Sequence, residues 1–186
     1  MTSNGVQVFI VDRLGTRLAF QLKPGMSVAI IGTDGTGKTT AAKMLADHLR
    51  EAGIACERHH WYRWGQALFF VPFAVGLNRL QKRCVQIFDR TLYDNVASWF
   101  NRSRAAADHQ HFKRVGWSVR IVRALAPRFD VVIFLVAAPE LIVKRRPEIS
   151  LDEARRAVGV YNQIGSVLGL VPLDQIGLAD RFNPGS

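Results

Sequence analysis

Apolar runs along this chain predict the strands of a buried parallel sheet. Val131–Val136 is continuously apolar and rich in β-branched residues, which is typical of a strand covered on both faces. Ser27–Ile31 and Val85–Phe88 also read as strands. A poorer strand is expected at Leu170–Asp174, because Pro172 cannot donate to a ladder.

Helical periodicity occupies much of the sequence between these runs. Apolar residues recur at i, i+3, i+4 and i+7 over Ala42–Leu49 and over Tyr93–Phe100. Ser150 and Glu153 have the spacing of a capping box, which predicts that a helix begins there. Strands that alternate with helices predict an α/β fold with a doubly wound sheet, whose ligand binds at the carboxyl ends of the strands.

The remaining segments give weaker predictions. Val6–Val11 and Thr16–Leu22 are β-rich runs joined by a short turn, which predicts an N-terminal hairpin ahead of the core. Ile54–Cys56 reads as a short strand. We expect a polar loop over 101–116 and then a helix at Trp117–Ala126. This helix ends at Ala126 because a proline follows.

The length of 186 residues suffices for one α/β domain with a sizeable core and is short for two. We therefore expect a single domain over 1–186, with a hairpin extension at 1–24 and a core at 25–176. The first five residues show no secretory signal, and the two cysteines give no disulfide framework, so a reducing cytoplasm is the expected compartment.

The excess of positive charge on this chain favours anionic partners. There are 25 Lys and Arg residues against 15 Asp and Glu residues, and the formal net charge of +10 favours nucleotides, nucleic acid or an acidic membrane surface. No nucleic-acid-binding module is recognisable. The sequence neither predicts nor excludes a homodimer.

The apolar stretch Ala67–Leu77 complicates the picture of a soluble domain. It is flanked by cations and is well short of the ~20 residues that a membrane span requires. It is either a buried helix or pocket wall, or an interfacial segment that rests on lipid at the periphery of a membrane.

Residues 32–39 read Gly-Thr-Asp-Gly-Thr-Gly-Lys-Thr and fit the phosphate-binding loop (P-loop) pattern G-x-x-x-x-G-K-[ST] at every fixed position. A strand pattern precedes the loop and a helical pattern follows it, as the motif requires. The glycines allow a sharp turn, so that backbone amides converge on phosphate oxygens at the start of a helix. Lys38 is then expected to reach the β- and γ-phosphates of ATP and act in catalysis, and Thr39 to ligate Mg²⁺. The predicted nucleotide-binding residues are Gly32, Thr33, Asp34, Gly35, Thr36, Gly37, Lys38, Thr39 and Thr40.

Asp89 and Arg90 directly follow the predicted strand Val85–Phe88 and are candidate catalytic residues. At a strand end beside the P-loop, Asp89 can hold Mg²⁺ through water or orient an acceptor, and Arg90 can clamp an acceptor anion. The alternative is a structural ion pair that caps the next helix. Arg145 and Arg146 can close over the triphosphate as a lid and stabilise transition-state charge, although a solvated helix face explains either arginine equally well.

An aromatic and cationic cluster spans His59–Trp64. Rings beside a cation suit a nucleobase, a sugar or an isoprenoid phosphate, but such residues also pack simply under a loop. Within the P-loop, the aspartate can face the acceptor or make a structural hydrogen bond. The predicted acceptor-binding residues are Asp34, His60, Trp61, Arg63 and Arg90.

The P-loop and the strand end Phe88–Arg90 together resemble the thymidylate kinase branch of the P-loop nucleoside monophosphate kinases, over about Ser27–Asp174. That family often has Asp-Gly before the Gly-Lys of the loop, as Asp34–Gly35 does here, and Ala137–Arg146 resembles its strand exit into an arginine-bearing lid. The resemblance implies a three-layer P-loop NTPase fold with a mostly parallel sheet, and ATP- and Mg²⁺-dependent phosphoryl transfer. Arg146–Glu153 resembles thymidylate kinase-like proteins of which some are associated with surface polysaccharide synthesis.

Two departures from that family concern the acceptor. Glu57–Arg63 stands where thymidylate kinases carry an Arg-Glu-Pro-Gly segment that helps to build the monophosphate site, and the lid is abbreviated. The acceptor is therefore open among nucleoside monophosphates and other phosphorylated metabolites. The alternative function is a P-loop ATPase or nucleotide-sensing subunit of a membrane-associated or polysaccharide-biosynthesis assembly, although the Leu-Ser-Gly-Gly-Gln signature of transporter ATPases does not follow the loop.

Overall fold

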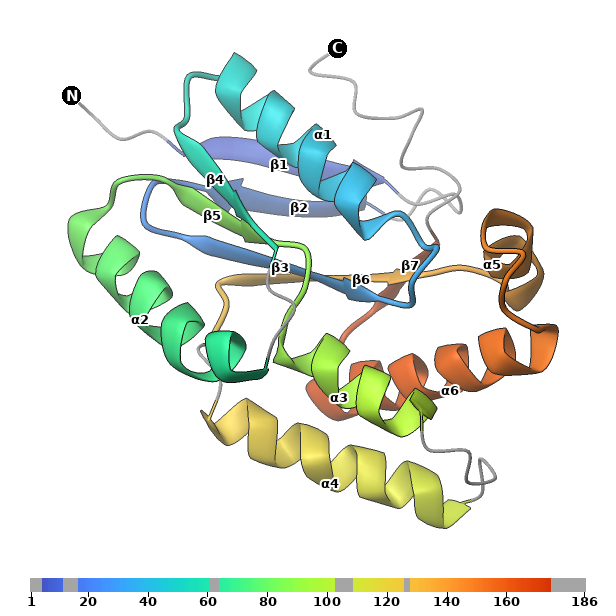
Figure 1. The fold of residues 1–186 in the computed structure, drawn as a ribbon. Coiled ribbons are helices and arrows are strands. Elements are labelled where there is room, and N and C mark those ends of the chain that lie inside the picture. Colours follow the sequence, from blue (N-terminus) through green and yellow to red (C-terminus); the bar gives the residue numbers. More distant parts are fainter. Residues whose placement is uncertain (1–4, 12–16, 61–63, 103–108, 126–127, 175–186) are drawn as a thin grey trace.

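The computed structural model describes residues 5–11, 17–60, 64–102, 109–125 and 128–174. Within these residues lie a five-stranded sheet, a separate two-stranded hairpin and six helices (Figure 1).

The sheet is built around β3 (Ser27–Gly32), whose residues are all buried. The other strands are β4 (Cys56–His59), β5 (Val85–Phe88), β6 (Val131–Val136) and β7 (Pro172–Asp174). All five run parallel in the order β4-β5-β3-β6-β7. The carboxyl ends of the strands therefore meet at one edge of the sheet, where α/β proteins bind their ligands.

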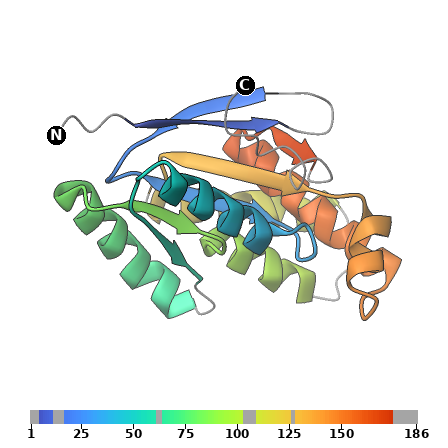
Figure 2. The same cartoon turned by 90° about the horizontal axis from the view of Figure 1, so that it is seen from above.

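Helices cover both faces of the sheet and give the molecule three layers (Figures 1 and 2). The helices are α1 (Lys38–Glu51), α2 (Trp64–Gln81), α3 (Leu92–Arg102), α4 (His109–Leu125), α5 (Pro139–Arg145) and α6 (Leu151–Leu168). α1 packs on one face, where Val28 and Ile30 of β3 enter its core. Ile31 points the other way, into the core formed with α3, α4 and α6. This is the three-layer P-loop NTPase fold that the sequence predicts.

The predicted N-terminal hairpin is confirmed as β1 (Val6–Val11) paired antiparallel with β2 (Arg17–Leu22). Val8 and Leu22 are fully buried in the core on the α1 side of the sheet. The hairpin therefore covers part of that face instead of standing apart from the domain. The last two residues of the predicted core, 175–176, lie outside the described residues.

The short strand predicted at Ile54–Cys56 lies further along the chain. β4 pairs with β5 in a register that begins at Cys56 and Val85, whereas Ile54 is buried in the core against α1. β4 is an edge strand whose residues are half-exposed or exposed, so its sequence lacks the apolar run of an inner strand.

The polar loop predicted over 101–116 is wrong for its described residues, because α3 continues to Arg102 and α4 begins at His109. The buried residues of α4 recur every three or four positions and include His111, Val115, Val119 and Val122. Exposed cations beside them make the first turns of this helix look like a loop in the sequence. The helix predicted at Trp117–Ala126 is confirmed as far as Leu125.

The apolar stretch Ala67–Leu77 forms the middle of α2. Val71 and Val75 are buried against β5, whereas Phe73 is 68% exposed and Leu77 is 39% exposed. The helix thus has one buried face and one exposed apolar face. Among the helices of the described residues, none combines the length and the apolar character that a membrane span needs.

Candidate functional site

The P-loop connects β3 to α1 through backbone that requires glycine. Gly35 and Gly37 have φ angles of 90° and 85°, in the left-handed region that strains other residues. Gly32 is required by space, because a Cβ there would lie 2.3 Å from the carbonyl oxygen of Leu135 on β6. Since α1 begins at Lys38, the loop ends at a helix N-terminus, where unpaired amides and the helix dipole favour phosphate.

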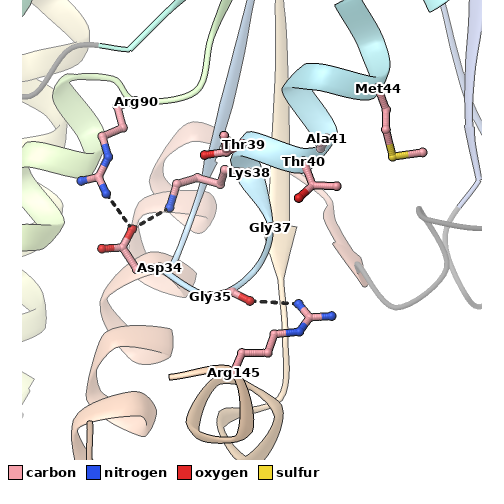
Figure 3. Close-up of a pocket in the computed structure, with 10 residues that line it drawn as sticks. All are labelled: Asp34, Gly35, Gly37, Lys38, Thr39, Thr40, Ala41, Met44, Arg90 and Arg145. Atoms are coloured by element: carbon pink, nitrogen blue, oxygen red, sulfur yellow. Dashed lines mark hydrogen bonds and ion pairs between the residues drawn. The ribbon is translucent and has the colours of Figure 1, made fainter. Parts of the chain in front are cut away.

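A first cavity of about 320 Å³ opens beside this loop (Figure 3). Thr39 and Thr40 stand exposed at its α1 side. Across from them, Arg145 of α5 donates a 2.9 Å hydrogen bond to the carbonyl oxygen of Gly35. The lining residues are Asp34, Gly35, Gly37, Lys38, Thr39, Thr40, Ala41, Met44, Arg90 and Arg145. Among the predicted nucleotide-binding residues, those outside this lining are Gly32, Thr33 and Thr36, which are buried.

Lys38 is folded back onto its own loop. Its Nζ donates to the carbonyl oxygens of Gly32 at 2.6 Å and Thr33 at 3.1 Å, and to the carboxylate of Asp34 at 3.1 Å. These partners hold the ammonium group at the mouth of the P-loop, where phosphate oxygens can replace the neutral carbonyls.

Asp34 collects three cations. Its carboxylate lies 3.1 Å from Lys38, 3.2 Å from Arg90 and 3.4 Å from Arg146. Burial raises the pKa of Asp34, but the positive charges of these three side chains outweigh burial, so the pKa lies below its ordinary value. Asp34 is therefore an anion that orients the arginines beside the P-loop.

A second cavity of about 260 Å³ lies between the P-loop, α3, α5 and α6. It shares Asp34 and Arg90 with the first cavity. Its lining is mixed in charge and consists of Thr33, Asp34, Arg90, Asp94, Ser98, Asn101, Ile142, Arg146, Ile149, Glu153, Arg156, Ala157 and Tyr161. The two cavities thus form adjoining compartments on either side of one ion pair.

Asp94 lines the second cavity but is not among the residues predicted from the sequence. It is buried in the first turn of α3, where one carboxylate oxygen accepts hydrogen bonds from the amide and hydroxyl of Thr91. The other oxygen accepts a 2.8 Å hydrogen bond from the hydroxyl of Tyr161 and lies 3.9 Å from Nζ of Lys38. The spacing of Thr91 and Asp94 is that of a helix cap, which is the one local signal for this residue.

The structure separates Asp89 from Arg90. Asp89 is buried at the end of β5, where its carboxylate contacts Nδ1 of His60 and lies 3.8 Å from Arg58. It is not among the residues that line either cavity, whereas Arg90 turns toward Asp34 and lines both. A catalytic or metal-binding role of Asp89 stays a prediction.

The aromatic and cationic cluster at the end of β4 is only partly described. The ring of His59 stacks on Phe88 with centroids 4.9 Å apart, and burial lowers the pKa of this histidine. His60 contacts Asp89. The predicted acceptor-binding residues Trp61 and Arg63 lie outside the described residues.

The two adjacent arginines after β6 line different cavities. Arg145 lines the first cavity and bonds Gly35. Arg146 lines the second, where it contacts Asp34 and donates a 2.6 Å hydrogen bond to Glu148. The two side chains thus line different cavities, and a lid role for either arginine stays a prediction.

The donor set fits Mg²⁺ bound together with a nucleotide. In the described part of the chain, no group of three or more His, Cys, Asp or Glu side chains could hold a metal ion by itself. Mg²⁺ in phosphoryl-transfer sites keeps several waters and takes few protein ligands besides the phosphates. Thr39, exposed at the start of α1 and lining the first cavity, can supply one such ligand.

The chain matches no known family model, and no curated protein matches its sequence. It is similar in structure to the YorR protein of Bacillus subtilis in complex with phosphorylated GDP, with 19% identity, a TM-score of 0.46 and a match over 80% of this chain and 84% of that one. It is also similar to deoxyadenosine kinase from M. mycoides with bound dCTP, with 18% identity, a TM-score of 0.44 and a match over 80% of this chain and 89% of that one. Identity and TM-score at this level assign no family to the chain.

Proposed function

We propose that the chain is an ATP- and Mg²⁺-dependent kinase that transfers a phosphoryl group to an anionic small molecule, as thymidylate kinase-like proteins do. The observation that carries this proposal is the pair of adjoining cavities that share Asp34 and Arg90. A hydrolase needs room only for water beside its nucleotide, whereas a kinase needs a second compartment that aligns an acceptor with the donor.

On the donor side, the loop and the start of α1 bind the phosphates of ATP. Lys38, now held by two loop carbonyls, exchanges them for the β- and γ-phosphates, because a charged acceptor makes the stronger hydrogen bond. Arg145 adds a second positive charge from across the cavity. The Thr39 hydroxyl would hold Mg²⁺, which would supply further neutralisation of the triphosphate.

On the acceptor side, Arg90, Arg146 and Arg156 give the second cavity three cations. Guanidinium groups match the planar pairs of oxygens on phosphate and carboxylate, so the acceptor carries such a group. Glu153 and Asn101 also line this cavity. The buried Oδ1 of Asn101 has no hydrogen-bond partner among the described residues. These acceptor atoms suit hydroxyl or amino groups. A nucleoside monophosphate or another phosphorylated metabolite carries both kinds of group.

In phosphoryl transfer the protein aligns the acceptor with the γ-phosphate and neutralises the charge of the phosphates. An oxygen of the acceptor bonds to the γ-phosphorus while the bond from this phosphorus to the β–γ bridging oxygen breaks, and ADP leaves with that electron pair. An acceptor phosphate attacks as an anion, so this step needs no general base. Arg90 lines both cavities and forms an ion pair with Asp34, which supports a role for its positive charge in stabilising the group in transfer.

The test is ADP formation from ATP and Mg²⁺ in the presence of nucleoside monophosphates, sugar phosphates or prenyl phosphates. A kinase forms ADP faster with one acceptor class than with none, and Arg156→Ala should raise the KM of that acceptor. Arg155→Ala is the matched control, because this neighbouring arginine is exposed and lines neither cavity. ADP formation that no acceptor changes would contradict the proposal and favour an ATPase.

A further inference from the structure

An apolar surface lies on α3 and α4, and α4 is the outermost helix on its side of the sheet (Figure 1). Trp99 of α3 is 68% exposed, Trp117 of α4 is 67% exposed, and Ile121, one turn after Trp117, is 40% exposed. A groove of about 390 Å³ runs between the helices and is lined by Val96, Trp99, Phe100 and Ser118. Large apolar side chains gathered on a surface mark an interaction site.

The same side of α4 is positively charged. Lys113, Arg114 and Arg120 are exposed, and no other described residue forms an ion pair with them. Lys113, Trp117, Arg120 and Ile121 have the spacing i, i+4, i+7 and i+8, which brings them to one face of the helix. The sequence of α4 contains no aspartate or glutamate, so this charge is not balanced along the helix.

We propose that this surface docks on an anionic lipid membrane. The α3–α4 surface consists of Trp99, Lys113, Arg114, Trp117, Arg120 and Ile121. Tryptophan has an apolar ring and one polar N–H, which suits the boundary between headgroups and acyl chains. Lysine and arginine are attracted to the negative charge of the headgroups, while isoleucine and the groove contact the acyl chains.

Charge complementarity favours lipid over the other occupants of this surface. A twofold contact between two copies would set the same face against itself and bring Lys113, Arg114 and Arg120 of each copy together, which like-charge repulsion opposes. Nucleic acid would satisfy the cations through its phosphates but would leave Ile121 and the apolar groove without a matching partner. Anionic lipid supplies both the negative charge and the apolar phase.

The test is co-sedimentation of the wild-type protein with vesicles of phosphatidylcholine, alone or mixed with phosphatidylserine. We expect binding to the mixed vesicles that weakens as salt rises, and quenching of tryptophan fluorescence by brominated lipid. Lys113→Glu combined with Arg120→Glu should weaken binding by at least roughly fivefold per cation. Trp117→Ser should weaken it without a change of charge.

The matched control combines Lys23→Glu with Lys43→Glu, which makes the same charge change at two exposed residues outside this surface. It should bind vesicles more tightly than the Lys113→Glu and Arg120→Glu variant. Equal loss in both variants, or no binding of the wild type to anionic vesicles, would overturn the proposal. So would binding of DNA in place of vesicles, or a wild-type dimer that Trp117→Ser converts to a monomer.

Discussion

The hydroxyl of Tyr161 donates a 2.8 Å hydrogen bond to the carboxylate of Asp94, which joins α6 to α3 in the wall of the second cavity. The same carboxylate lies 3.9 Å from Lys38. Burial raises the pKa of Asp94, and the charge of Lys38 and the hydrogen bonds from Tyr161 and Thr91 oppose that rise. Through Asp94, the lysine of the P-loop is connected to the compartment proposed for the acceptor.

Tyr161→Phe should lower the free energy of unfolding by about 1–3 kcal/mol, because it removes a buried hydrogen bond to a carboxylate. Urea unfolding measures this loss. Tyr93→Phe is the control, since Tyr93 is equally buried and its hydroxyl has no hydrogen-bond partner among the described residues. Equal destabilisation by the two substitutions would show that the hydrogen bond to Asp94 contributes little.

Lys38→Ala should lower kcat/KM for ATP by roughly 100-fold or more, because the developing charge on the phosphates loses its nearest cation. The change leaves the core intact, so circular dichroism should report a folded protein. Lys43→Ala, on the exposed side of the same helix, should leave ADP formation unchanged. Unaltered turnover in folded Lys38→Ala protein would refute the assignment of the P-loop.

Arg145→Ala and Arg146→Ala should affect different substrates, although the residues are adjacent. Arg145 lines the first cavity and Arg146 the second, so the former should raise the KM of ATP and the latter the KM of the acceptor. Loss of one charge-assisted contact predicts a rise of roughly 10- to 100-fold in each case. Steady-state kinetics with both substrates varied would separate the effects, and an identical pattern in the two variants would argue for one shared lid.

Asp34→Asn should reduce stability at neutral pH and matter less in acid. Burial raises the pKa of Asp34, but Lys38, Arg90 and Arg146 bring the folded-state value below the ordinary one. A carboxyl group with a lowered folded pKa contributes stability above its unfolded pKa, and this contribution is lost as pH falls through the folded value. The difference in unfolding free energy between wild type and Asp34→Asn should therefore be constant above about pH 4 and shrink below it.

Urea unfolding of both proteins across this pH range makes the comparison. A difference that stays the same in acid would show that Asp34 stabilises the fold through its shape rather than its charge.

The parts of the fold that the sequence predicts are those set by contiguous residues. β3 and β6 are apolar because both of their faces are covered, and Ser150 and Glu153 make both hydrogen bonds of the capping box. The misplaced elements depend on distant partners. β4 is defined by its register against β5, and the buried stripe of α4 is interrupted in the sequence by exposed cations such as Lys113.

The residues of the candidate site also fall into those that a local motif predicts and those that depend on distant partners. The P-loop is a local motif and lies where the sequence predicts, between β3 and α1. Successive side chains at a strand end point to opposite sides, and only the structure shows that Arg90 turns toward Asp34 and Asp89 toward His60. Tyr161 is 67 positions from Asp94, so no local pattern connects them.

Transfer of a phosphoryl group between the two cavities can be observed directly by following the γ-phosphate itself. ATP labelled in that phosphate is incubated with the protein, Mg²⁺ and the acceptor that most stimulates ADP formation, and the products are separated. We expect the label to move to the acceptor, and Lys38→Ala to abolish this transfer. Label recovered only as inorganic phosphate, at a rate that the acceptor does not change, would contradict the proposed kinase activity.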